Sequence, residues 1–179
     1  MRLETAQLIV RGVRGTDAET LHDIRQRVAA FQGSSVRTLA ETVAMCAEME
    51  SVQPGARPGW HQFAIELHDG KIVGDIGVNF DGPGSRQVEL GYSLHPDWWG
   101  RGIASEAIGK LMSWLFGERQ VHRIVARTGD NNLRSCALLE RLGFRREGVL
   151  IESWWEEDAQ AWSDEAIYAL LAREFAQRN

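Results

Sequence analysis

The chain has 179 residues, of which 44% are hydrophobic and 25% are charged. This length and apolar content fit one globular domain over residues 1–179 and exclude intrinsic disorder. Asp and Glu total 25 against 20 Lys and Arg, a formal net charge of −5. We therefore expect no nucleic-acid partner, because phosphate binding needs a basic surface.

Cysteine spacing and the distribution of apolar residues narrow the class further. Cys46 and Cys136 lie far apart and form no CxxC pair, so neither a disulfide framework nor a metal site is expected. The N-terminus lacks the apolar core of a signal peptide, and no apolar run reaches the ~18 residues that span a bilayer. The sequence predicts a soluble cytoplasmic protein without a membrane partner.

The first third of the chain predicts one short strand and two helices. Residues 8–10 are rich in β-branched and large apolar side chains. Thr16 is placed to cap a helix that begins at Asp17, where acids meet the positive end of the helix dipole. A second helix is expected over 38–49, and the Pro- and Gly-rich residues 54–59 then break the chain.

The middle of the chain predicts an antiparallel meander of three strands. Apolar residues alternate over 63–67, and strands over 72–80 and 88–94 follow. Residues 68–71, which include Asp and Gly, and residues 81–85, which include Asp, Gly and Pro, supply the turns.

The last part predicts helices that alternate with strands. One-sided apolar spacing indicates helices over 104–115 and 132–142, with a short strand at 124–126 between them. Gly143 suits a left-handed helix end. Residues 166–175 fit a helix by propensity, but their apolar alternation also fits a strand. The resemblance described below favours a strand at their start. The order of elements predicts an α/β or α+β domain.

The segment Gly100-Arg101-Gly102 is the most informative motif, because it follows a strand and a Pro-containing turn and opens a helix. Glycines allow backbone N–H groups to approach a phosphate, and a helix N-terminus favours an anion. A Walker loop requires Gly-Lys-Ser/Thr, which the chain lacks. A Rossmann fold requires a carboxylate about 20 residues on, where residues 121–127 are basic.

A third ligand class, acyl-coenzyme A, follows from a family resemblance. Residues 99–104 are similar to the Arg/Gln-x-x-Gly-x-Gly/Ala motif of the GNAT superfamily of N-acetyltransferases, with Trp99 in place of Arg or Gln. Residues 91–107 resemble its ribosomal-protein N-terminal acetyltransferase (RimJ/RimL-like) branch, and residues 132–144 resemble its Asn-x-x-Ser…Leu-Gly-Phe helix. Further similarity lies at residues 3–11 and 162–171.

The resemblance implies a single GNAT-like domain with a mixed, mainly antiparallel sheet flanked by helices, and acetyl-CoA as cosubstrate. Ser135 would protonate the leaving thiolate, and either Glu89 or a water relay would act as base. The backbone N–H of Leu94 would bind the thioester carbonyl. The implied cofactor-binding residues are Leu94, Trp99, Gly100, Arg101, Gly102, Ile103, Ala104, Ser105 and Asn132.

Several of these residues also have structural interpretations. Asn132 and Ser135 are both typical of a helix N-terminus, where capping alone would account for them. Glu89 would equally suit a solvated strand, and Asp75 would either contact an amine or face water. Cys136 is expected to pack as a small apolar residue.

Two further segments with aromatic residues are candidates for substrate binding. Residues 154–158, Trp-Trp-Glu-Glu-Asp, would bind a cation through aromatic faces and carboxylates, or would form an exposed loop tip. Trp60 and His61 follow the Pro/Gly loop, which either acts as a lid or packs at a strand edge.

The function expected from this resemblance is acetyl transfer from acetyl-CoA to a primary amine in a direct ternary complex. A protein N-terminus, a polyamine, an amino sugar and an antibiotic amine all remain open as acceptors, because such pockets are built from variable loops. The alternatives are a non-catalytic acyl-CoA-binding sensor on the same fold and, less favoured, a nucleotide-binding protein. A homodimer is possible.

Overall fold

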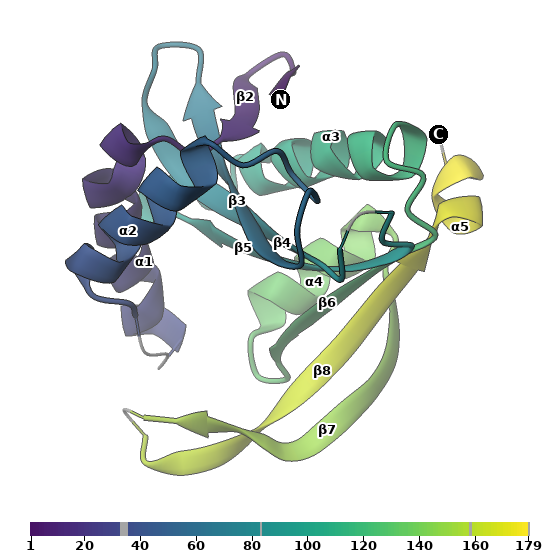
Figure 1. The fold of residues 1–179 in the computed structure, drawn as a ribbon. Coiled ribbons are helices and arrows are strands. Elements are labelled where there is room, and N and C mark those ends of the chain that lie inside the picture. The colour runs from purple at the N-terminus through teal and green to yellow at the C-terminus, as the bar shows by residue number, and fades with distance from the viewer. Residues whose placement is uncertain (33–35, 83, 158, 179) are drawn as a thin grey trace.

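A computed structural model describes residues 1–32, 36–82, 84–157 and 159–178. Its centre is an eight-stranded sheet in the order β1-β2-β3-β4-β5-β6-β8-β7 (Figure 1), in which every neighbouring pair is antiparallel except β5 and β6. The strands are β1 (Arg2–Glu4), β2 (Leu8–Gly12), β3 (Gly59–Leu67), β4 (Ile72–Phe80), β5 (Gln87–Leu94), β6 (Arg123–Gly129), β7 (Arg145–Glu156) and β8 (Ala161–Leu171). The predicted mixed, mainly antiparallel sheet is confirmed.

Helices cover both faces of this sheet (Figure 1). The helices α1 and α2 lie on one face and α3 and α4 on the other, and α5 follows β8 near the end of α3. Their bounds are α1 (Ala18–Gln32), α2 (Leu39–Glu50), α3 (Ile103–Gly117), α4 (Leu133–Leu142) and α5 (Ala172–Ala176), with 3₁₀ turns at Gly15–Asp17 and Pro96–Trp98. No helix in the described ranges is both long and apolar enough to cross a membrane.

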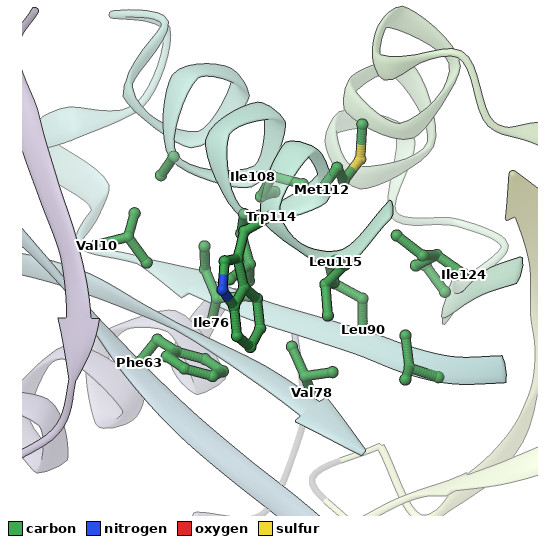
Figure 2. Packing of buried hydrophobic residues seen from close by; sticks show 14 of the residues in the cluster. Val10, Phe63, Ile76, Val78, Leu90, Ile108, Met112, Trp114, Leu115 and Ile124 are labelled. Carbon is green, nitrogen blue, oxygen red and sulfur yellow. The ribbon is translucent and has the colours of Figure 1, made fainter. Parts of the chain in front are cut away.

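The main core lies between α3 and the sheet (Figure 2). Ile108, Leu111, Met112 and Leu115 recur at helical spacing on one side of α3, and each is at most 1% exposed. They pack against alternating strand residues such as Val78, which are also buried. Removing this apolar surface from water fixes α3 on the sheet, and with it the glycine-containing loop that precedes the helix.

The only parallel strand pair in the described sheet separates along its length. β5 pairs with β6 from Gln87–Arg123 to Leu90–Ala126. Beyond Leu90, residues 91–94 pair with β4 alone. The sheet therefore opens on one side of β5 into a gap, and this gap positions the site described below.

The start of α1 differs from its prediction. Thr16 lies inside a 3₁₀ turn, and α1 begins one residue later than expected, at Ala18. The carboxylate of Asp17 makes the local contacts instead, because it accepts hydrogen bonds from the Arg11 guanidinium at 2.7 and 3.1 Å and from the Arg14 amide at 2.7 Å. The buried charge of Arg11 needs this partner, so the acid faces the interior rather than solvent.

The C-terminal hairpin is longer than predicted. Trp154 and Trp155 lie on the paired strand β7 rather than in a loop tip, and the hairpin of β7 and β8 extends beyond the rest of the sheet (Figure 1). Asp158 lies outside the described residues. The two interpretations of residues 166–175 each hold in part, since β8 runs to Leu171 and α5 begins at Ala172.

Candidate active site

The backbone of Leu94 lies at the open side of β5. The His95 amide donates to Val73 O of β4 at 2.8 Å. Because successive residues of a strand alternate between its two edges, the Leu94 amide and carbonyl face away from β4, toward the gap. The Leu94 carbonyl accepts a hydrogen bond from Trp99 Nε1 at 2.7 Å. The Leu94 N–H is thus a fixed donor beside the gap.

The glycine-containing loop next to this donor leaves backbone N–H groups open. Gly100 and Gly102 have φ angles of 73° and 80°, which disfavour other residues. A Cβ added at either position would meet no heavy atom within 4 Å, so this surface is open. Gly102 is the N-cap of α3, and no side chain caps its first N–H groups. Open N–H groups at the start of a 15-residue helix fit a pyrophosphate.

Cationic side chains surround the loop. Arg101 and Lys71 lie over the Trp98 ring, with Cζ and Nζ at 4.9 and 5.4 Å from its centroid. Arg134, in the first turn of α4, lies with Cζ 4.5 Å from the centre of the Trp99 ring. These charges add to the positive potential of the helix N-terminus. Trp99 ties the loop to both Leu94 and α4, a role that the sequence motif did not indicate.

The start of α4 forms the second wall of the site. Asn132 Oδ1 accepts a hydrogen bond from the Ser135 amide at 3.2 Å, so the capping interpretation of Asn132 is confirmed. The Ser135 side chain takes no part in this cap. Its Oγ lies 2.6 Å from the hydroxyl oxygen of Tyr92 on β5. Burial raises the pKa of Tyr92 to about 12, and the hydrogen bond with Ser135 opposes that rise.

Sequence analysis missed Tyr92. Strand alternation was the available signal, because Tyr92 shares a face of β5 with the buried residues Leu90 and Leu94. That face packs against α3 and α4.

The predicted base lies on the opposite face of β5. Glu89 and Gly91 alternate with Leu90 and Tyr92, so they face the α1 side of the sheet. The Glu89 side chain is 32% exposed, and its Oε1 lies 3.7 Å from Arg127 Nε. Glu89 and Ser135 therefore approach the gap from opposite faces.

Trp60 covers the α1 side of the sheet beside Gly91. A Cβ added at Gly91 would lie 3.7 Å from the Trp60 ring, and one added at Gly77 would lie 3.0 Å from it. A cavity of about 400 Å³ lies between α2 and the start of β3, with Trp60, Met45 and Met49 in its lining. This cavity and the gap thus share Trp60 as a boundary.

Other predicted candidates have structural contacts. His61 is 3% exposed, and its Nε2 lies 3.1 Å from Arg57 O, which supports packing rather than a lid. Asp75 is also 3% exposed and forms an ion pair with Arg25, so the prediction that it faces water is wrong. Cys136 packs half-buried against the main core.

The hairpin indoles remain exposed. Trp154, Trp155 and Trp162 are 45%, 40% and 57% exposed, and Trp155 and Trp162 pack edge to face at 5.5 Å. Trp155 Nε1 donates to Glu157 at 2.8 Å. The hairpin therefore presents aromatic rings and carboxylates together.

The structure thus combines a strand gap that has a backbone donor with an uncapped helix start beside it, and the chain belongs to the GNAT family of acetyltransferases. The family's "Acetyltransferase (GNAT) domain" profile matches residues 7–145. Among its relatives, the uncharacterized N-acetyltransferase YoaA of Bacillus subtilis is 31% identical over 173 residues, 94% of this chain and 96% of that one.

Two further comparisons concern ribosomal-protein acetyltransferases. The [ribosomal protein uS5]-alanine N-acetyltransferase of Escherichia coli is 37% identical over 73 residues, 38% of each chain. The solved structure of RimL, a ribosomal L7/L12 α-N-protein acetyltransferase in complex with coenzyme A, superposes with a TM-score of 0.81 at 19% identity. It covers 96% of this chain and 98% of that one, a likeness of fold.

Proposed function

We propose that this protein transfers an acetyl group from acetyl-CoA to a primary amine by direct attack in a ternary complex. The observation that carries the proposal is the gap between β5 and β6, which the Leu94 N–H faces and which the glycine-containing loop adjoins. A thioester carbonyl needs a fixed donor and a pyrophosphate needs unpaired N–H groups, and both features occur together here.

Different residues of the chain bind different parts of the cosubstrate. Backbone groups of Gly100, Gly102 and the first turn of α3 bind the pyrophosphate, and Arg101 adds charge. Trp99 acts by holding the loop and the Leu94 carbonyl in place. Bound acetyl-CoA supplies the activated acetyl group. The proposed binding set is Leu94, Trp99, Gly100, Arg101, Gly102, Ile103, Ala104, Ser105 and Asn132.

Acetyl transfer also requires two proton movements. Glu89, directly or through water, accepts the proton that the attacking amine loses, and the Leu94 N–H stabilises the oxyanion. Ser135 gives a proton to the sulfur as the carbon–sulfur bond breaks. A base such as Glu89 suits an α-amine with a pKa of about 8 better than a lysine near ~10.4.

The acceptor approaches from the Glu89 face, where Trp60 and the neighbouring cavity lie. A peptide N-terminus fits this face because its first side chain can pack against Trp60 while the amine reaches the gap. The E. coli relative is named as an alanine N-acetyltransferase of a ribosomal protein.

Calorimetric titration with acetyl-CoA, ATP and NAD tests the first half of the proposal. We expect micromolar binding of acetyl-CoA and much weaker binding of the other two. Thiol release across a panel of peptides with free N-termini, their N-acetylated counterparts as controls, and small amines tests the second half. If the folded protein does not bind acetyl-CoA, the proposal is contradicted. Binding without thiol release for any amine identifies a non-catalytic sensor instead.

A further inference from the structure

A pair of hydroxyl groups joins β5 to α4 at the gap. Tyr92 lies in residues 91–94, the part of β5 that has separated from β6. Its hydroxyl oxygen is 2.6 Å from Ser135 Oγ. A distance this short between two hydroxyls is a hydrogen bond in which one group donates and the other accepts.

The chemistry of the two groups indicates the direction of this bond. A phenol is a stronger acid than an alcohol and therefore the better donor. Burial of Tyr92 favours its neutral form, so the phenol keeps its proton at neutral pH. With Tyr92 as donor, the Ser135 proton is free to face another acceptor. The cap from Asn132 to the Ser135 amide fixes the backbone of the same residue.

We propose that Tyr92 is a positioning residue, whose hydrogen bond to Ser135 Oγ orients the serine proton toward the sulfur that leaves during acetyl transfer. This inference rests on the proposed function. As the carbon–sulfur bond breaks, its electron pair stays on sulfur, which takes the Ser135 proton. The bond from Tyr92 stabilises the charge on Oγ until the proton released by the amine returns to it through water.

The two tyrosines of the chain provide a matched pair of variants. Tyr168 is buried on β8. Its hydroxyl also forms a hydrogen bond with α4, because it donates to Glu140 Oε1 at 3.2 Å. Tyr92→Phe should lower kcat about tenfold, a tenth of the ~100-fold that loss of a general acid costs. The KM values for acetyl-CoA and the amine should change less than about twofold, because Tyr92 contributes in the transition state and not to ground-state binding. Tyr168→Phe should leave kcat unchanged.

A double-mutant cycle distinguishes orientation from general damage. Ser135→Ala should lower kcat about 100-fold, and adding Tyr92→Phe to it should lower kcat no further, since Tyr92 acts through Ser135. Thermal unfolding of the same variants without ligand provides a second readout. Each single variant should lower Tm by about 2–4 °C through the shared hydrogen bond, and the double variant by about the same amount.

The possible results separate this inference from the proposed function. Wild-type protein that binds no acetyl-CoA or acetylates no amine overturns both. An active wild type with an unchanged kcat in Tyr92→Phe overturns only the role of Tyr92. Multiplicative losses of kcat in the double variant, or an equal loss in Tyr168→Phe, also overturn it, because they indicate structural effects.

Discussion

Two helix N-termini border the gap, and they are built differently. The helix α3 begins at Gly102, in a left-handed conformation, with no side chain on its first N–H groups. The helix α4 begins at Asn132, whose side chain bonds to the Ser135 amide. An uncapped start leaves donors for a ligand, whereas a capped start is stable by itself. We infer that α3 binds the anionic part of the cosubstrate and α4 holds a reacting hydroxyl.

A substitution that blocks the uncapped N-terminus of α3 gives the largest expected effect, on acetyl-CoA affinity. Gly102→Glu places a side chain at φ 80° and a negative charge beside the helix N-terminus. Calorimetry should show that acetyl-CoA affinity falls at least about 100-fold, since strain and charge repulsion both oppose a pyrophosphate.

A second glycine of α3 provides the control for this substitution. Gly109 lies in the middle of the helix, and a Cβ there would meet no heavy atom within 4 Å. Gly109→Glu adds the same charge to the same helix and should leave acetyl-CoA affinity within about twofold, because helix-dipole effects fall off within one turn. Equal affinities for the two variants would contradict the placement of the phosphate site.

Loosening the contact between the two helix starts gives a smaller effect. Trp99→Phe removes the hydrogen bond from Nε1 to the Leu94 carbonyl at 2.7 Å. We expect the KM for acetyl-CoA to rise about tenfold or less, which corresponds to a bond worth ~1 kcal/mol. Trp114→Phe is the control, because it makes the same substitution at a buried residue of α3 that packs in the core. It should lower Tm without changing the KM for acetyl-CoA. A KM that rises equally in both variants would assign the effect to packing.

The same contrast explains what the sequence allowed us to predict. The starts of these two helices, the strands that precede them and the Gly100–Gly102 loop were predictable, because glycine, capping residues and apolar spacing act locally. Tyr92 was missed because its contact with Ser135 joins residues 43 positions apart, and local patterns contain no such pairing.

The hairpin and Asp75 were misjudged for related reasons. Residues of β7 show no clear alternation of buried and exposed positions and have two register shifts, so no period-2 pattern marked the strand. Asp75 was expected to contact an amine or to face water, whereas it is buried in an ion pair. Its partner, Arg25 on α1, lies 50 residues away and became visible only in the fold.

Removing the side-chain cap of α4 gives the smallest expected effect, and it distinguishes the two roles proposed for Asn132. Asn132→Ala removes the cap on the Ser135 amide and should lower the free energy of unfolding by about 1 kcal/mol, measured by denaturant titration. Asn132→Asp keeps a side-chain oxygen for this cap and should retain the stability, because Asp and Asn cap equally well. If the Asn132 amide group also binds acetyl-CoA, Asn132→Asp weakens that affinity severalfold while the fold stays intact, since the carboxylate has no N–H to donate. Equal acetyl-CoA affinity in Asn132→Asp and wild type assigns Asn132 to the helix cap alone.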